Sequence, residues 1–403
     1  MKRLAAAALA LCFLLSLGCG VAVAKKKRLV DFAVDGQGRA VALLQLAKDT
    51  RPLLARFTAE GALDTTFSGD GALRPRLFGF GAHFALEESG DLILGGRLAG
   101  APPGRSVILY RYRSDGRRDR SFGPPGQVRL PYGELARLFV QPSGHVLALP
   151  VGVCPPRACG YLYRLVKVVR LTPSGRRAGF GSGNGEQWQL LAAAMNPRGG
   201  LLVAGEAVDL QYVDFQRFAP DADYRGFLRE DIGLPPEEEW QEEFVPAITD
   251  LAFMADWKFA ETPFFGPEIW LRNSDGSPDL SFGDGGRAAC GYEPEPGKYR
   301  GFFAGPPFSS VAVTADQKLV AAGGYGPCGL VRFLADGSLD PSFAGGAVNV
   351  EAAGMPRPTA LALLPDGGAL VAGWDPAAKA LRVARYSPDG ALVPTYGSGG
   401  IAT

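Results

Sequence analysis

The stretch SDGSPDLSFGDGG, residues 274–286, surrounds the aromatic side chain of Phe282 with aspartate, glycine and proline. This mixture suits either an oxygen-rich metal site or a tight turn. Related phrases occur at five other places in the chain, and each contains one aromatic residue. The six aromatic residues are Phe67, Phe122, Phe180, Phe282, Phe343 and Tyr396. A phrase that recurs along the whole chain indicates repeated architecture and not one chemical site.

The spacing of these aromatic residues predicts seven repeat units. Successive residues lie 55, 58, 102, 61 and 53 positions apart, and 102 is close to two periods. A degenerate unit is therefore expected between Phe180 and Phe282, where segments 196–207 and 215–227 supply it. The whole chain of 403 residues, with 55 Gly and 32 Pro, fits many short strands separated by turns.

Each unit contains four segments with the pattern of short β-strands, and four strands in about 55 residues are typical of a propeller blade. The first two segments flank a turn that carries Gly or Asp, as in LLPDGGALVAG at 363–373. We therefore predict an all-β fold, one seven-bladed β-propeller of four-stranded antiparallel blades in residues 25–403. The predicted blades span approximately residues 28–77, 82–131, 135–189, 190–230, 247–291, 309–351 and 359–403.

The phrase resembles the DGxLDxSFGxxG motif of the delta-60 repeats, a family of secreted bacterial proteins. The agreement is closest at the pairs Asp64/Phe67, Asp279/Phe282 and Asp340/Phe343. It weakens at Arg177/Phe180, where one residue is lost, and at Val393/Tyr396, where the Asp is absent. The resemblance covers nearly all of the chain after the N-terminal segment. It implies a propeller-like β fold and export, and it implies no activity.

The residues of the phrase have structural roles that do not depend on the resemblance. Asp-Gly suits a turn that needs a positive φ angle. The following aspartates (Asp64, Asp119, Asp279 and Asp340) can accept hydrogen bonds from turn amides. The aromatic side chain is large enough to fill the gap between adjoining blades. Calcium binding remains an alternative, although the spacing matches no EF-hand and the unit FGPPG lacks the acidic residue.

Residues 1–24 have the pattern of a signal peptide. Lys2 and Arg3 precede an apolar run, and small residues end at Ala24, the expected cleavage position. The run is too short for a transmembrane helix. We expect a secreted or periplasmic protein. In the alternative, the sequence LSLGC is a lipobox that places a lipid on Cys19 and anchors the protein at the cell surface.

The charge distribution argues against nucleic acid as a partner. Residues 25–188 contain 25 basic and 13 acidic residues, whereas residues 189–403 contain 15 and 28. The two halves therefore attract ions of opposite sign. The arginines of the first half are scattered along predicted strands without interleaved aromatic residues, so no nucleic-acid-binding surface is expected.

Four cysteines follow the signal peptide, and an even number in an exported protein favours two disulfides. Cys154 and Cys159 share one predicted loop. Cys290 and Cys328 lie in two loops expected on one face of the propeller. We predict these two pairs. No CxxC, HExxH or Cys/His cluster is present, so no zinc site is expected.

The long irregular segments fall almost entirely in the connections between second and third strands and between blades. In a four-stranded meander these connections share one face, and irregular loops on a rigid scaffold commonly bind ligands. The loops contain acidic and aromatic residues, and we expect these to bind a protein or carbohydrate ligand. The candidate residues are Glu237, Glu238, Glu239, Trp240, Phe264, Phe265, Tyr292 and Tyr299. The alternative is a solvated acidic loop with aromatic residues that hold long loops against the blades.

The sequence contains no recognisable catalytic motif, and no catalytic residue or cofactor is predicted. His83 and His145 are the only histidines, and we interpret both as surface polar residues. The favoured function is a non-enzymatic binding or scaffold propeller. The alternative is a propeller enzyme of the hydrolase, lactonase or dehydrogenase type, with a metal held in the central channel by carboxylates. Its candidate ligands are Asp31, Asp250 and Glu87. A purely structural protein is a third possibility.

Overall fold

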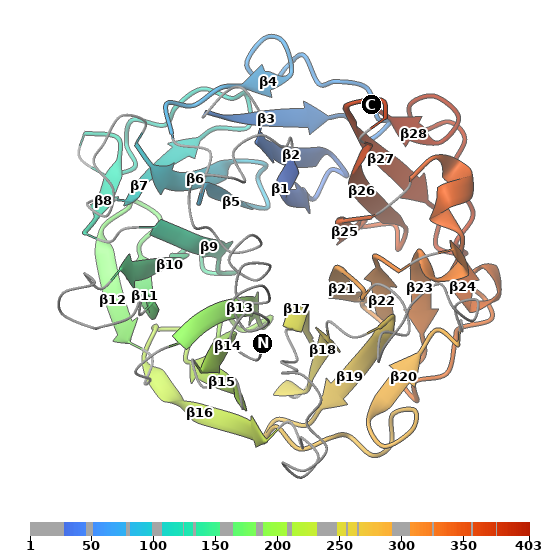
Figure 1. Ribbon diagram of the computed structural model, residues 1–403. Helices are drawn as coiled ribbons and strands as arrows, with labels where there is room; N and C mark the ends of the chain where they lie inside the picture. Colours follow the sequence, from blue (N-terminus) through green and yellow to red (C-terminus); the bar gives the residue numbers. More distant parts are fainter. Residues whose placement is uncertain are drawn as a thin grey trace, which may run out of the picture.

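The computed structural model confirms the seven-bladed propeller (Figure 1). It describes residues 28–45, 51–77, 81–98, 107–123, 125–131, 134–153, 164–182, 188–207, 212–231, 248–254, 257–263, 266–291, 307–324, 326–355, 358–375 and 377–403. Seven four-stranded antiparallel sheets form a ring, and each sheet contains four strands that are consecutive in the sequence. The first strand of each blade lies nearest the axis and the fourth lies at the rim.

The first four blades contain β1 to β16. Blade one contains β1 (Arg28–Val34), β2 (Ala40–Gln45), β3 (Pro52–Phe57) and β4 (Ala72–Leu73). Blade two contains β5 (His83–Leu86), β6 (Leu92–Arg97), β7 (Val107–Tyr112) and β8 (Val128–Leu130). Blade three contains β9 (Glu134–Val140), β10 (Val146–Val153), β11 (Arg164–Leu171) and β12 (Arg177–Ser182). Blade four contains β13 (Trp188–Met195), β14 (Leu201–Ala207), β15 (Tyr212–Phe218) and β16 (Tyr224–Asp231).

The last three blades contain β17 to β28 and three short 3-10 helices. Blade five contains β17 (Ile248–Phe253), β18 (Phe259–Pro263), β19 (Glu268–Arg272) and β20 (Arg287–Ala289). Blade six contains β21 (Ser310–Val313), β22 (Leu319–Ala322), β23 (Leu330–Phe333) and β24 (Ala347–Val348), with η3 (Gly326–Cys328), η4 (Ala344–Gly346) and η5 (Val350–Ala353). Blade seven contains β25 (Ala360–Leu363), β26 (Ala369–Asp375), β27 (Ala380–Tyr386) and β28 (Ile401–Ala402).

The turns of the repeated phrase have the backbone geometry that the sequence predicts. In blade six the turn after β23 closes through a hydrogen bond from Gly337 N–H to the Leu334 carbonyl (3.0 Å). Gly337 has a φ angle of +84°, which a residue without a Cβ adopts at little cost. Blade four has Ala222 at the corresponding position with a φ angle of +72°, so the degenerate unit keeps the same turn without glycine.

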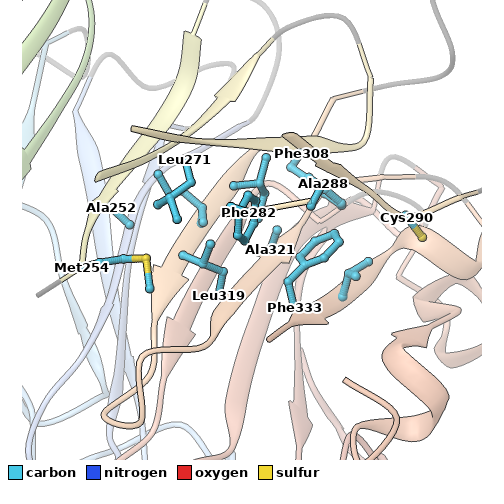
Figure 2. Packing of buried hydrophobic residues seen from close by; sticks show 14 of the residues in the cluster. Ala252, Met254, Leu271, Phe282, Ala288, Cys290, Phe308, Leu319, Ala321 and Phe333 are labelled. Carbon is cyan, nitrogen blue, oxygen red and sulfur yellow. The ribbon is translucent and has the colours of Figure 1, made fainter. Parts of the chain in front are cut away.

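Five of the six aromatic residues of the phrase fill the gaps between blades, as predicted. Phe67, Phe122, Phe282, Phe343 and Tyr396 are all buried. Figure 2 shows one such gap, in which Phe282 of blade five lies among Leu319, Ala321 and Phe333 of blade six. Each large ring buries on the order of 150–250 Å² of surface, so these residues dominate the contacts between neighbouring sheets.

The prediction for Phe180 is wrong. Its side chain is 42% exposed, because the shortened phrase in blade three continues as the regular strand β12 and places Phe180 on the outer strand. Lys167 and Arg177 lie over its ring instead, at 5.9 and 4.9 Å from the centroid. The gap between blades three and four is filled by Phe218, which is buried beside Leu147 and Val168.

Hydrogen bonds between neighbouring blades repeat with the phrase. The residue after the aromatic side chain donates its backbone N–H to a carbonyl in the turn of the next blade. The pairs are Ser68–Asp115, Gly123–Ser174, Gly283–Asp336, Ala344–Asp389 and Gly397–Glu60, with N···O distances of 2.7–2.9 Å. The last pair joins blade seven to blade one. Tyr396 is buried at that junction among Phe57 and Val383, so the ring closes by packing between the two terminal blades.

Candidate functional site

The aspartates of the repeated phrase accept hydrogen bonds from turn amides, as the sequence predicts. The Asp340 carboxylate accepts hydrogen bonds from the Ser342 backbone N–H (3.0 Å) and hydroxyl (2.6 Å). It also pairs with Arg332 Nε (2.8 Å) and Lys318 Nζ (3.0 Å). Burial raises the pKa of Asp340, but these donors and cations outweigh it and hold the pKa well below its usual value. Asp64, Asp119 and Asp279 make the same local hydrogen bonds.

A polar cavity of about 240 Å³ lies among the innermost strands of the ring. Its described lining residues come from the first strands of six blades and from positions directly before those strands, and none of them belongs to blade four. The charged lining residues are Asp31, Arg137 and Asp250, and the lining hydroxyls are those of Thr249, Ser309, Ser310 and Thr359. This cavity is the candidate site, because it combines concavity with convergent polar groups.

The three charged residues of the cavity and Ser310 share one register position. In every blade this position lies four residues before the residue that opens the turn between the first and second strands. The seven residues, from blade one to blade seven, are Asp31, His83, Arg137, Ala192, Asp250, Ser310 and Ala360. The residue type at this position of the first strand therefore varies from blade to blade, whereas the contacts between neighbouring blades are repeated.

Asp31, His83 and Arg137 form a group on three successive blades. His83 Nδ1 lies 3.1 Å from Asp31 Oδ2, and the same oxygen accepts the Phe84 backbone N–H at 3.3 Å. Arg137 lies farther away, with its nearest nitrogen 3.9 Å from Asp31 Oδ1 and 3.5 Å from His83 Nδ1. Burial raises the pKa of Asp31, but His83, Arg137 and the Phe84 N–H outweigh it and lower the pKa.

Asp250 occupies the same position in blade five but has no cation beside it among the described residues. Its Oδ2 accepts the Ser310 hydroxyl and the Val311 backbone N–H, both at 3.0 Å. Burial raises the pKa of Asp250 above its usual value, although the Val311 N–H and the charge of Arg137 oppose the shift. Like Asp31, Asp250 follows a β-bulge, at which the pairing of the first and second strands shifts by one residue. Bulges of this kind re-aim side chains near functional sites.

The hydroxyls beside these carboxylates connect neighbouring inner strands. Thr249 donates to the Phe308 carbonyl of the next blade (2.6 Å), and Ser309 donates to the Pro358 carbonyl (2.9 Å). The walls of the cavity are therefore held by contacts that cross from blade to blade. Such a frame positions polar groups before any ligand arrives, which lowers the cost of ordering them.

Two of the three carboxylates predicted in the channel, Asp31 and Asp250, line this cavity. Glu87 does not. It pairs with Arg111 and lies in a second hollow of about 560 Å³ between the first turns of blades two, three and four. The described residues contain no group of three or more His, Cys, Asp or Glu side chains arranged to hold a metal ion.

The structure corrects the interpretation of His83 as a surface residue, because its side chain is 13% exposed and faces Asp31. His145 does lie in an exposed turn, where Nδ1 is 3.0 Å from the Ser143 hydroxyl oxygen. Arg137 was not a candidate in the sequence. Alignment of the seven first strands on their turns would have placed His83 and Arg137 in one layer with Asp31 and Asp250.

The loop residues expected to bind a ligand lie outside the described residues. They are Glu237, Glu238, Glu239, Trp240, Phe264, Phe265, Tyr292 and Tyr299. Cys154, Cys159, Cys19 and the rest of the N-terminal segment 1–27 also lie outside them. Within the described part of the chain, no helix has the length and apolar character needed to cross a membrane.

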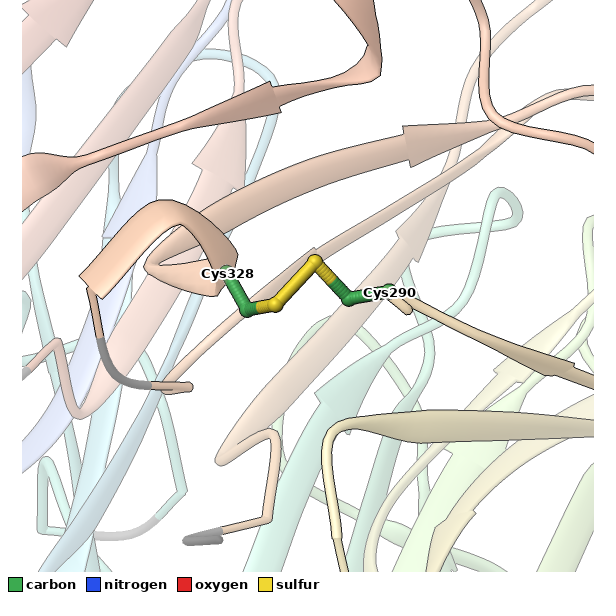
Figure 3. Close-up of a disulfide and its surroundings, with 2 residues drawn as sticks. All are labelled: Cys290 and Cys328. Atoms are coloured by element: carbon green, nitrogen blue, oxygen red, sulfur yellow. A yellow bond between two sulfur atoms is a disulfide. The ribbon is translucent and has the colours of Figure 1, made fainter. Parts of the chain in front are cut away.

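Cys290 and Cys328 form the predicted disulfide (Figure 3), with an S–S distance of 2.08 Å and a Cα–Cα distance of 5.9 Å. Cys290 directly follows β20 of blade five, and Cys328 ends η3 of blade six. The bond therefore links two neighbouring blades covalently. Cys328 is completely buried and Cys290 nearly so, within the same apolar cluster as Phe282.

Comparisons with known proteins agree with the repeat and the fold. Residues 45–67 and 314–343 match the family described as "Domain of unknown function (DUF5122) beta-propeller". No curated protein matches the chain.

Solved structures with similar folds include a protein from Lactobacillus plantarum, at 12% identity and a TM-score of 0.51, over 91% of this chain and 94% of that one. The Kuenenia stuttgartiensis hydrazine synthase has 9% identity, a TM-score of 0.47 and coverage of 88% and 94%. The virginiamycin B lyase from Staphylococcus aureus has 11% identity, a TM-score of 0.45 and coverage of 77% and 82%. At such identities the likeness concerns the fold alone. The chain is thus a repeat protein of β-propeller fold.

Proposed function

We propose that the protein is a non-enzymatic binding propeller that holds a small polar ligand in its axial cavity. The observation that carries this proposal is the layer of first-strand residues. One position of the repeat places Asp31, Arg137, Asp250 and Ser310 around the cavity, and His83 at the same position contacts Asp31. The repeated aspartates, in contrast, are engaged in hydrogen bonds and ion pairs within their own blades. Charged groups that converge on a preformed cavity are typical of a ligand site.

A thermal-shift screen of the purified protein tests this proposal. Classes of sugars, organic acids, amines and amino acids are compared on the wild type and on Arg137→Gln. A ligand of the cavity raises the melting temperature of the wild type by mass action and raises that of the variant less. If no class stabilises the wild type, or if every active class acts equally on the variant, the proposed axial site is wrong.

The loop residues predicted from the sequence form a second part of the proposal. The acidic and aromatic set around Trp240 would bind a protein or carbohydrate on the face opposite the tight turns. A pull-down from a cell-surface extract, followed by glycan-array binding, tests it. Replacement of Trp240 together with Glu237, Glu238 and Glu239 should abolish capture, and unchanged capture would exclude these residues.

We also propose that the protein is exported, as a member of the delta-60 repeat group. The support is the signal-peptide pattern of residues 1–24 and the disulfide between Cys290 and Cys328, a bond typical of oxidising compartments. Cell fractionation and the mass of the mature N-terminus test this proposal. A chain that begins at Lys25 supports cleavage after Ala24, and a chain that begins with lipid-modified Cys19 supports a surface anchor.

A propeller enzyme is the second candidate, favoured by the contact between Asp31 and His83 in the cavity. A histidine held by a carboxylate is a common arrangement for proton transfer. Asp31 and Asp250 could also hold a metal through carboxylate oxygens. Metal analysis after purification, with calcium included, and hydrolase and lactonase assays separate this candidate from a binding protein. Turnover that is lost in His83→Ala would favour the enzyme.

A further inference from the structure

Arg137 presents a positive charge that the described residues do not fully satisfy. Its guanidinium carries five N–H donors, and its closest acidic oxygen, Asp31 Oδ1, is 3.9 Å away. That carboxylate already receives His83 Nδ1 and the Phe84 N–H through its other oxygen. About 35% of the Arg137 side chain is exposed, and the residue lines the cavity. Arg137 can therefore receive an anionic group of a ligand in the fork geometry that suits a carboxylate.

Asp250 presents a negative charge at the same cavity. The Ser310 hydroxyl and the Val311 backbone N–H, which donate to its carboxylate, are neutral, and no ion pair among the described residues involves Asp250. Arg137 and Asp250 do not contact each other, although the charge of Arg137 partly opposes the rise that burial causes in the pKa of Asp250. Ser310 donates its hydrogen to Asp250, so the hydroxyl oxygen remains able to accept a bond. The carboxylate and the hydroxyl together suit an ammonium group, which offers three donors.

The two charges lie in blades that are separated only by blade four. At the same layer that blade carries Ala192, whose side chain packs against blade five and does not line the cavity. No charged side chain of this layer therefore stands between Arg137 and Asp250. The volume of about 240 Å³ is below the roughly 300–1,000 Å³ of pockets for drug-sized ligands, which limits the occupant to a small molecule.

We propose that the axial cavity binds a small zwitterion, with the ligand carboxylate on Arg137 and the ligand ammonium on Asp250 and Ser310. Free α-amino acids belong to this chemical class. This inference rests on the proposed binding function and names the class of ligand. Two opposite charges held at fixed positions select a molecule that carries both, since a singly charged analogue leaves one charge of the cavity unpaired.

Isothermal titration of the full chain with free α-amino acids tests the inference. Each amino acid is compared with its N-acetyl form, which keeps only the carboxylate, and with its amide, which keeps only the ammonium. Binding of the free amino acid should be at least about tenfold tighter than binding of either analogue. Equal binding of an analogue, or no binding of any free amino acid up to about 10 mM, overturns the zwitterion class.

Two isosteric variants locate the two ends of the ligand. Arg137→Gln should weaken binding of the free amino acid about tenfold or more. The variant should then bind the free amino acid and its amide with equal affinity. Asp250→Asn keeps an oxygen that can accept the Val311 N–H. This variant should bind the free amino acid and its N-acetyl form with equal affinity. Arg176→Gln and Glu60→Gln, at exposed positions, serve as matched controls. Variants that bind as tightly as the wild type contradict the assignment of these residues.

The outcomes separate this inference from the proposed function. If a neutral sugar or a simple anion binds and Arg137→Gln abolishes that binding, the axial site is correct and the zwitterion class is wrong. If no small molecule of any class binds, both the axial site and the ligand class fail. The analogue series uses only the wild-type protein, so it decides the question even if a variant does not fold.

Discussion

The junction between blades six and seven differs from the junction between blades three and four. At the first, Phe343 is buried, Asp340 pairs with Arg332, and Arg332 Nη1 donates to the Pro388 carbonyl of the next blade (2.6 Å). The Ala344 N–H donates to the Asp389 carbonyl (2.8 Å). All of these groups belong to the repeated phrase or to the strand paired with it.

At the junction between blades three and four, other residues perform these tasks. Phe180 is exposed and Phe218 fills the gap. Gln141 accepts from Arg170 Nε (2.9 Å) and donates to the Gly199 (2.6 Å) and Pro220 (2.7 Å) carbonyls of blade four. Both junctions therefore contain a buried aromatic ring and a side chain that donates to the neighbouring turn. The repeated phrase is one way to supply them.

The largest effect is expected from removal of residues 386–403. This deletion removes Tyr396 and the strand β28 at the junction that closes the ring, and Tyr386 at the junction between blades six and seven. The deletion also removes Gly397 and with it the hydrogen bond to the Glu60 carbonyl. Arg385, which donates to the Ala59 carbonyl (2.9 Å), becomes the last residue of the chain. We expect loss of cooperative unfolding, measured by circular dichroism during heating. Deletion of the exposed Thr403 alone is the control, and a cooperative melt of the long deletion would contradict closure by blade seven.

Asp340→Asn should destabilise the protein by about 3–5 kcal/mol at pH 7, because it leaves the buried Arg332 without its counter-charge. The lowered pKa of Asp340 means that its contribution is present above the unfolded pKa, near 4, and is lost as the pH falls below that value. The difference in urea unfolding free energy between wild type and variant should therefore shrink at low pH. Glu60→Gln, at an exposed position, should have almost no effect at either pH. A difference that does not depend on pH would argue against the ion pair.

A smaller effect of opposite sign is expected at the ring-closing junction. Burial raises the pKa of the Tyr396 hydroxyl, which has no hydrogen-bond partner among the described residues. Tyr396→Phe should stabilise the protein by about 1 kcal/mol, since it removes a buried polar group that is not satisfied. Phe343→Tyr places a hydroxyl at the corresponding position between blades six and seven and should destabilise by a similar amount. Destabilisation by Tyr396→Phe would indicate a partner for the hydroxyl.

The fold could be predicted because the same local sequence pattern occurs in most of the units. Turn glycines, alternating strands and the spacing of the aromatic residues agree with one another, so even the degenerate fourth unit was placed by its length and by segments 196–207 and 215–227. The error at Phe180 has a local cause. Loss of one residue from the phrase changes a turn into the strand β12, and periodicity by itself does not reveal such a change.

The candidate site was predicted only in part. Asp31 and Asp250 were expected in the channel because carboxylates on first strands face inward, and both line the cavity. His83 and Arg137 were missed because their importance depends on neighbours in other blades, more than 50 residues away in sequence. Such contacts follow from the register of seven strands and not from any local motif.

The unfolding free energies of Phe343→Ala and Phe180→Ala, measured side by side in urea, test most directly the claim that the repeated phrase encodes joints between blades. Phe343 is 2% exposed and fills a gap, so its truncation should cost about 3–5 kcal/mol. Phe180 is 42% exposed, and its truncation should cost less than about 1 kcal/mol. Equal losses at the two positions would contradict the claim.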